Sequence, residues 1–224
     1  MEKYVEKMVE FCEKNFNLND AEFPQYDSLS VAIVDCVYSL QMDYENEVKP
    51  IVEKYKKFLN EKGKNGDSLK EFLEYIEEVG GCQKFADAAL NESKNKQNGI
   101  LKAEICKNLA RRLYLLGIDT HEDFVSYFDT EKEEILEVVI MSVKGVGIAA
   151  LNYLFMLNGD PNRCKIDTHL TKCIKEACGY ESKKDEDYQI LMKNTVEKLN
   201  KRYPKLTMAD LDYVIWNGYS SGKK

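Results

Sequence analysis

A chain of 224 residues, 44% of them hydrophobic, is long enough to enclose a hydrophobic core, which excludes an intrinsically disordered protein. It contains no apolar run near the roughly 20 residues of a membrane-spanning helix, and its acidic start is unlike a signal peptide, so we expect a cytoplasmic protein with no membrane partner. The net charge of −7 weighs against a polyanionic partner unless positive charge is concentrated locally.

The cysteines do not form a recognisable framework. There are seven of them, an odd number, and no two form a C-x-x-C pair, which argues against a disulfide network and against a zinc site. We therefore expect most of them to be reduced and to pack as small hydrophobic side chains. They are Cys12, Cys36, Cys82, Cys106, Cys164, Cys173 and Cys178.

Helices dominate the predicted structure. Only four prolines interrupt the chain and the alternating runs of β-strands are missing, so we expect an all-α fold of about a dozen helices with short connections. Apolar residues at helical spacing predict a helix from Ile100 to Leu116, preceded by a polar loop over residues 91–99. Capping-box signatures predict helix starts at Ser68-x-x-Glu71, Thr130-x-x-Glu133 and Thr207-x-x-Asp210.

Residues 133–157 are predicted to form a pair of helices. Glu133–Ser142 and Ile148–Leu157 have helical patterns, and the short turn between them contains Gly145 and Gly147. These glycines would relieve backbone crowding and leave free N–H groups at the start of the second helix, where phosphate binds readily. A plain turn between packed helices is the alternative interpretation, and the glycines alone do not exclude it.

The same region is the basic part of an acidic chain. Residues 140–175 carry a net charge of +3, which leaves −10 for the rest of a chain whose total is −7. The charged residues of this segment are Lys144, Arg163, Lys165, Lys172 and Lys175 against Asp160 and Asp167. Positive charge is therefore concentrated around the two predicted helices and the loop that follows them.

Asp167 stands after a Gly/Pro loop and directly before a predicted helix with the sequence THLTKCIKEAC. Aspartate is a preferred N-cap residue, so a structural cap is one interpretation. A catalytic carboxylate is the other, because the helix dipole and the free amides favour the ionised form. The two interpretations are compatible.

Together these segments resemble a known signature. Gly145-Val146-Gly147, an amphipathic helix, a Gly/Pro loop and Asp167-Thr168-His169 resemble the helix-hairpin-helix DNA glycosylases, the endonuclease III superfamily. Two weaker similarities accompany this match: Val37-Tyr38-Ser39-Leu40-Gln41 resembles the family's "L-S-x-Q" helix end, and Lys102-Ala103 followed by Ile105 resembles its "K-A-x-x-I" helix.

The resemblance implies an all-α fold of two helical lobes with a central cleft. A central helical barrel lobe would span residues 28–157 and include the helix-hairpin-helix motif at about 133–157. The second lobe would combine residues 1–27 with 158–224 and carry the catalytic aspartate. The protein would act as a monomer, associated with the nucleoid if the source is prokaryotic.

The resemblance also implies a function in base-excision DNA repair. The substrate would be double-stranded DNA with a damaged or mismatched base, which must leave the stack before its glycosidic bond can be reached. Asp167 would stabilise the positive charge that develops on the sugar. The residues implied to contact DNA are Lys144, Gly145, Val146 and Gly147 in the hairpin, Gln41 in the gap left by the extruded base, and Arg163 and Lys165 at phosphates.

Two departures from the family pattern shape the expected chemistry. Strand-cleaving relatives carry a nucleophilic lysine where this chain has Ala149, so we expect a monofunctional glycosylase that uses water. Many relatives also hold an iron–sulfur cluster on four cysteines after the aspartate, but only Cys173 and Cys178 follow Asp167. We therefore expect no cluster and no other cofactor, although the resemblance allows a weakly held cation at the hairpin.

Three hypotheses remain from the sequence. The first is an active monofunctional glycosylase, supported by the spacing of the motif and its local basic charge. The second is a catalytically inactive DNA-binding relative, which would fit Ala149 and the acidic total charge. The third is a helical protein-interaction domain in which the glycines and Asp167 are only structural, and it leaves the spacing unexplained.

Overall fold

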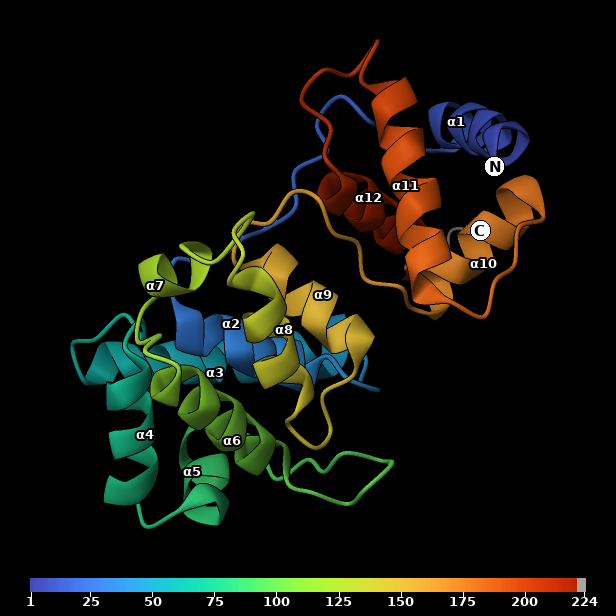
Figure 1. Ribbon diagram of the computed structural model, residues 1–224. Helices are drawn as coiled ribbons and strands as arrows, with labels where there is room; N and C mark the ends of the chain where they lie inside the picture. The colour runs from blue at the N-terminus through green and yellow to red at the C-terminus, as the bar shows by residue number, and fades with distance from the viewer. Residues whose placement is uncertain (221–224) are drawn as a thin grey trace. The chain divides into compact units, whose positions relative to one another are not determined.

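The computed structural model describes residues 1–220 and confirms the all-α prediction (Figure 1). These residues form twelve α-helices and one short π-helix, and their only β-pairing is an isolated bridge. In chain order the elements are α1 (Glu2–Asn15), α2 (Leu29–Tyr38), η1 (Tyr44–Val48), α3 (Lys49–Glu61), α4 (Leu69–Glu78), α5 (Cys82–Ala89), α6 (Lys102–Leu115), α7 (His121–Val125), α8 (Glu133–Met141), α9 (Ile148–Leu157), α10 (Thr168–Cys178), α11 (Asp185–Leu199) and α12 (Met208–Ser220).

The chain divides into two compact units. Unit 1 joins residues 1–24 to the chain from residue 160 onwards, and unit 2 comprises residues 25–159. The boundaries thus lie at 24/25 and 159/160, where the sequence suggested 27/28 and 157/158. The segment before α2 belongs to unit 2 because the amide of Tyr26 donates to the carbonyl oxygen of Leu157 at 2.9 Å.

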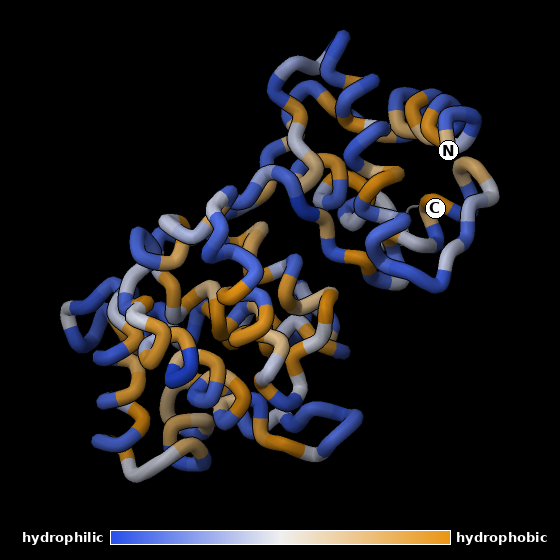
Figure 2. Tube along the Cα trace, in the orientation of Figure 1, coloured by the Kyte–Doolittle hydropathy of each residue, from blue (hydrophilic) through white to orange (hydrophobic). Residues whose placement is uncertain are grey.

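Helix α2 is the centre of unit 2. All ten of its residues are buried, and it contacts α3, α4, α6 and α9. Helix α9 is buried from Ala150 to Leu157, and both helices carry almost continuous apolar sequence, as a helix surrounded by others requires. Figure 2 shows hydrophobic residues along the packed helices and hydrophilic residues in the loops.

A buried carboxylate interrupts the apolar sequence of α2. Asp35 has no exposed surface, and its oxygens accept hydrogen bonds from three tyrosine hydroxyls. Tyr26 and Tyr44 donate to Oδ2 at 2.7 and 2.8 Å, and Tyr153 donates to Oδ1 at 3.1 Å. The cluster links the entry segment, the start of η1 and helix α9 to α2, because a buried charge requires such partners.

The tyrosines of this cluster stay protonated. Burial, followed by the negative charge of Asp35, raises the pKa of Tyr26, Tyr44 and Tyr153 above the usual value of a phenol. Each hydroxyl therefore remains a donor to the carboxylate at physiological pH.

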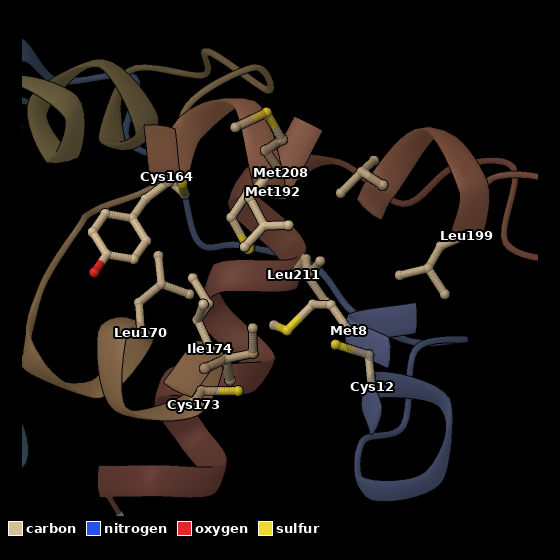
Figure 3. Packing of buried hydrophobic residues seen from close by; sticks show 14 of the residues in the cluster. Met8, Cys12, Cys164, Leu170, Cys173, Ile174, Met192, Leu199, Met208 and Leu211 are labelled. Atoms are coloured by element: carbon tan, nitrogen blue, oxygen red, sulfur yellow. The ribbon is translucent and has the colours of Figure 1, made fainter. Parts of the chain in front are cut away.

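Unit 1 is built from α1, α10, α11 and α12 around its own core. Helix α1 contacts α10 and α11, and α12 contacts the same two helices. Figure 3 shows cysteines, methionines and leucines from these helices packed together. All seven cysteines are free and six are buried, which confirms the prediction of reduced, packed thiols.

The capping signatures were correct at two of three positions. The hydroxyl of Ser68 accepts the amide of Glu71 at the start of α4, and Thr207 and Asp210 bind each other's amides before α12. The prediction at Thr130 is wrong. Its hydroxyl accepts the amide of Lys132 at 3.2 Å and not that of Glu133, and α8 begins only at Glu133, with Lys132 at its N-cap.

None of the helices within residues 1–220 combines the length and apolar character needed to cross a bilayer.

Replacing Asp35 by alanine should destabilise the protein by about 3 kcal/mol or more, because three hydroxyls donated to the carboxylate would lose it as their acceptor. Urea denaturation followed by circular dichroism measures the effect. Asp27→Ala, at an exposed carboxylate nearby, is the control and should change the free energy of unfolding by less than about 0.5 kcal/mol. Equal costs for the two variants would contradict the structural role of the cluster.

Candidate functional site

Helices α8 and α9 are present over the predicted residues and are joined by a tight turn. The amide of Val143 donates to the carbonyl of Ile140 at 3.1 Å, and the amide of Val146 donates to that of Val143 at 3.0 Å. Both valines are buried, so their side chains fix the turn to unit 2. Lys144, between them, is exposed.

Gly145 has a conformation and a position that favour glycine. Its φ is +102°, in the left-handed region that L side chains rarely adopt. A Cβ at this position would lie 2.7 Å from Cδ1 of Ile105 and 3.3 Å from Nδ2 of Asn98. The turn therefore packs closely on α6 and on the loop before it.

Gly147, unlike Gly145, has open surroundings. It is the N-cap of α9, its φ is −116°, and a Cβ there would meet nothing within 4 Å. Glycine has no side chain that could cap the helix, and no group within residues 1–220 accepts a hydrogen bond from the amides of Gly147, Ile148 or Ala149. Three amides at the positive end of the helix dipole consequently lack a hydrogen-bond partner within the described residues, which is the arrangement that binds an anion.

Gln41 lies just past the end of α2 in a constrained turn. Its φ is +63°, uncommon for a residue other than glycine. The buried amine of Lys102 holds this turn, donating to the carbonyls of Tyr38 at 2.9 Å and Leu40 at 2.5 Å. Gln41 itself is exposed, and its Oε1 accepts the amide of Lys96 at 3.1 Å.

The loop before α6 is ordered as a short hairpin. Lys94 and Leu101 form the isolated bridge, and the buried side chain of Asn95 accepts the amides of Gln97 at 2.9 Å and Asn98 at 3.3 Å. The loop thus touches two predicted site elements, since Lys96 binds Gln41 and Asn98 adjoins Gly145. Figure 1 shows it as the extended green loop that precedes α6.

Three lysines on this part of unit 2 carry positive charge without an ion pair in the described part of the chain. Lys94, Lys96 and Lys144 are exposed, and none of them forms an ion pair within the described residues. In contrast, seven lysines of unit 2 pair with a glutamate: Lys49, Lys56, Lys57, Lys62, Lys64, Lys70 and Lys107. Unpaired lysines next to free helix amides favour a polyanion as ligand.

The remaining predicted residues belong to unit 1, in the segment that leads to α10. Arg163 is paired with Asp160, its Nε lying 3.1 Å from Oδ2, and both side chains are largely buried. This ion pair offsets the positive charge expected to meet a phosphate. Lys165 is half-buried, and its amide donates to Oδ2 of Asp212 at 2.8 Å.

A side chain of α11 and a backbone amide of α12 hold this segment in place. Gln189 of α11 binds Cys164 on both sides, accepting its amide at 3.3 Å and donating to its carbonyl at 2.6 Å. The amide of Met208 donates to the carbonyl of Pro161 at 3.0 Å. Cys164 and Leu170 are both in the core of unit 1 (Figure 3), so the chain is anchored before and after the aspartate.

Asp167 uses one of its two oxygens as a helix cap. Oδ1 accepts the amides of His169 at 2.8 Å and Leu170 at 3.0 Å, and the side chain is half-buried. No hydrogen bond to Oδ2 is present within residues 1–220. The carboxylate is therefore held in position by one oxygen while the other is available to a ligand.

A second carboxyl group, that of Asp212, binds the segment that leads to α10. Asp212 of α12 is 6% exposed, and burial together with the negative charge of Asp167 raises its pKa to about 8. The amide and the charge of Lys165 oppose this shift. The carboxyl group of Asp212 consequently keeps its proton to a higher pH than an ordinary aspartate does.

Sequence reasoning missed several of these residues. Lys94 and Lys96 lay in a stretch predicted only as a loop, although two lysines in NESKNKQNG were a visible signal. Asp212 gave no signal, because its partners are more than forty residues away in the chain. No three His, Cys, Asp or Glu side chains within the described residues are grouped as a metal site would need.

The comparison with protein families gives one match. Residues 6–220 match a family described as "Domain of unknown function (DUF8548)". The chain belongs to this family. No curated protein and no solved structure matches the DUF8548 chain.

Gly145→Ala should destabilise the DUF8548 chain by about 1–3 kcal/mol, because alanine disfavours a positive φ and its methyl group would collide with Ile105. Gly147→Ala is the matched control and should change the free energy of unfolding by no more than about 0.5 kcal/mol, since the space around it is open. Thermal and urea unfolding measure both. An equal effect at the two glycines would refute this account of the turn.

Proposed function

We propose that the protein is a base-excision DNA glycosylase of the helix-hairpin-helix type, acting without strand cleavage. The observation that carries the proposal is the state of Asp167, whose Oδ1 is committed to capping α10 while Oδ2 accepts no hydrogen bond within residues 1–220. The sequence resemblance gives the reaction, because the aspartate stands twenty residues after the second glycine of the turn.

The carboxylate suits hydrolysis of an N-glycosidic bond. As the base departs, positive charge develops on the sugar, and a fixed negative charge lowers the energy of that transition state. Oδ2 of Asp167 would face the sugar or orient the attacking water, and the two amides at Oδ1 would keep the group from turning away. The acceptor is water and no cofactor is required.

Unit 2 supplies the proposed grip on DNA. The free amides of Gly147, Ile148 and Ala149 would bind a phosphate, and the exposed lysines 94, 96 and 144 would bind others along the backbone. Such contacts position the protein but do not select a sequence. Gln41, held by Lys96 in its constrained turn, would occupy the space of the extruded base.

The side chain at position 149 limits the reaction. Alanine cannot attack the sugar to form a Schiff base, so the proposed product is an abasic site in an intact strand. Breaks should then appear only after hot alkali. The presence of alanine at position 149, where strand-cleaving relatives have lysine, also favours a second candidate: a DNA-binding relative that excises no base.

Asp167→Asn separates capping from chemistry. Asparagine retains an oxygen for the amides of His169 and Leu170 but lacks the charge, so base excision should fall by about 100-fold or more while the free energy of unfolding changes by less than about 0.5 kcal/mol. The assay uses duplexes with deaminated, oxidised, alkylated or mismatched bases, scored for alkali-dependent breaks.

The control for this variant is Asp43→Asn, the same change at the cap of η1, where Oδ1 accepts the amide of Asn46 at 2.8 Å. It should retain full activity. A wild-type protein that binds these duplexes but cuts none after alkali supports the inactive relative. Unchanged excision by Asp167→Asn would refute the assigned role.

The three unpaired lysines should control the salt dependence of DNA binding. Changing Lys94, Lys96 and Lys144 together to alanine should weaken binding and reduce the slope of log K against log salt by about 0.9 for each phosphate that is no longer neutralised. Fluorescence anisotropy at several salt concentrations measures this slope. Lys49→Ala, at a lysine already paired with Glu45, is the control and should leave it unaltered.

If the wild type does not bind DNA, or binds it without any dependence on salt, the proposed function fails and a protein-interaction domain becomes the better interpretation.

A further inference from the structure

Helix α12 contributes one buried polar contact to the segment that carries Asp167. Oδ2 of Asp212 accepts the amide of Lys165 at 2.8 Å, two residues before the aspartate. The contact belongs to a set of side-chain bonds from α11 and α12 that hold this segment. On α12, Met208 and Leu211, near Asp212, lie in the core of unit 1 (Figure 3), so Asp212 is on an element with little freedom to move.

Two carboxyl groups near each other in a partly buried place resist joint ionisation. Asp167 is half-buried and Asp212 is 6% exposed, so water screens their repulsion poorly. The helix that follows Asp167 supplies two amides that stabilise its charge. Asp212 receives only one amide and is the more deeply buried of the two, and because burial is the largest cause of its raised pKa, it is the member of the pair that keeps a proton.

The other groups around Asp212 are consistent with a protonated Asp212 and an ionised Asp167. Of the charged groups of unit 1, Asp167 at the start of α10 and Lys165 in the loop act on it, with opposite signs. Helix α11 presents the uncharged Gln189 to the same segment. The pKa of Cys164 is raised by burial and by both aspartates, so this neighbour remains a neutral thiol.

We propose that Asp212 is a positioning residue for Asp167: in its uncharged form it holds the Lys165 amide through Oδ2 and leaves the only negative charge of the pair on Asp167. Ionisation of Asp212 would place a second negative charge beside Asp167 and push the two groups apart. The role in catalysis rests on the proposed function, whereas the coupling between the two carboxyl groups does not.

The coupling is tested directly by titrating the carboxyl carbons with NMR in the full chain. Wild-type Asp212 should titrate well above an ordinary aspartate, and in Asp167→Asn its pKa should fall by about one unit or more because the neighbouring charge is gone. An Asp212 pKa that is the same in both proteins overturns the proposal, whatever activity the wild type shows.

The stability of the protein gives a second readout. The folded chain holds the Asp212 proton up to about pH 8, whereas the unfolded chain releases it near pH 4, so this group contributes stability at low pH that is lost as the pH rises through about 8. The melting temperature of Asp212→Asn, which has no proton to lose, should therefore decline less between pH 6 and 9 than that of the wild type. Parallel declines overturn the proposal.

Activity then tests the positioning role. Asp212→Asn keeps an acceptor for Lys165 and should work within about threefold of the wild type at pH 7, but it should not share the alkaline loss of the wild type above pH 8. Asp212→Leu removes the acceptor and should lower kcat by about tenfold at pH 7 with DNA affinity unchanged. Full activity of Asp212→Leu at pH 7 would overturn the positioning role.

Failure of the proposed function and failure of the proposed coupling between Asp212 and Asp167 give different results. If no duplex is cut by the wild type while Asp212 responds to Asp167→Asn, the proposed function fails and the coupled pair stands. If bases are excised while Asp212 titrates as an ordinary aspartate, the pair fails and the proposed function stands.

Discussion

A helix starts with amide groups that have no partner inside the helix, and the two candidate site elements of this chain meet that deficit in opposite ways. Helix α10 satisfies its first amides with Asp167, at 2.8 and 3.0 Å from one carboxylate oxygen. Helix α9 has Gly147 as its N-cap residue, and no side chain within residues 1–220 caps its first amides. A negative group is thus fixed at one helix start, and a negative ligand is attracted to the other.

Three buried ionisable groups support α9, α10 and the turn that presents Gln41, and each group is stabilised by different means. Asp35 receives three tyrosine hydroxyls and keeps α9 bound to α2, so the helix with the free amides has a rigid base. Lys102 donates to the carbonyls at the end of α2 and braces the turn that presents Gln41. Asp212 has a single amide partner and a neighbouring charge, so it is stabilised by keeping its proton.

Each unit carries different residues of the proposed function. Unit 2 has the turn, the loop before α6 and the unpaired lysines, which together suit a phosphate backbone. Unit 1 has the carboxylate and the segment that α11 and α12 hold in place. The ion pair between Arg163 and Asp160 suggests that this segment is built to fix Asp167 more than to attract DNA.

Features that depend on near neighbours can be read from the amino-acid sequence: helical content, the caps at Ser68 and Thr207, the glycine turn and the aspartate that caps α10. These follow from contacts across three or four residues, although Thr130 shows that a local signal fails when the hydroxyl accepts the amide of another residue, here Lys132. The three-dimensional packing was needed to show that Lys96 binds Gln41, that three tyrosines donate to Asp35, and that the charge of Asp167 acts on Asp212. Each of these contacts depends on burial and on packing between separate elements. Burial and packing between elements produce no periodic pattern and no fixed spacing in the sequence, so these contacts could not be predicted from it.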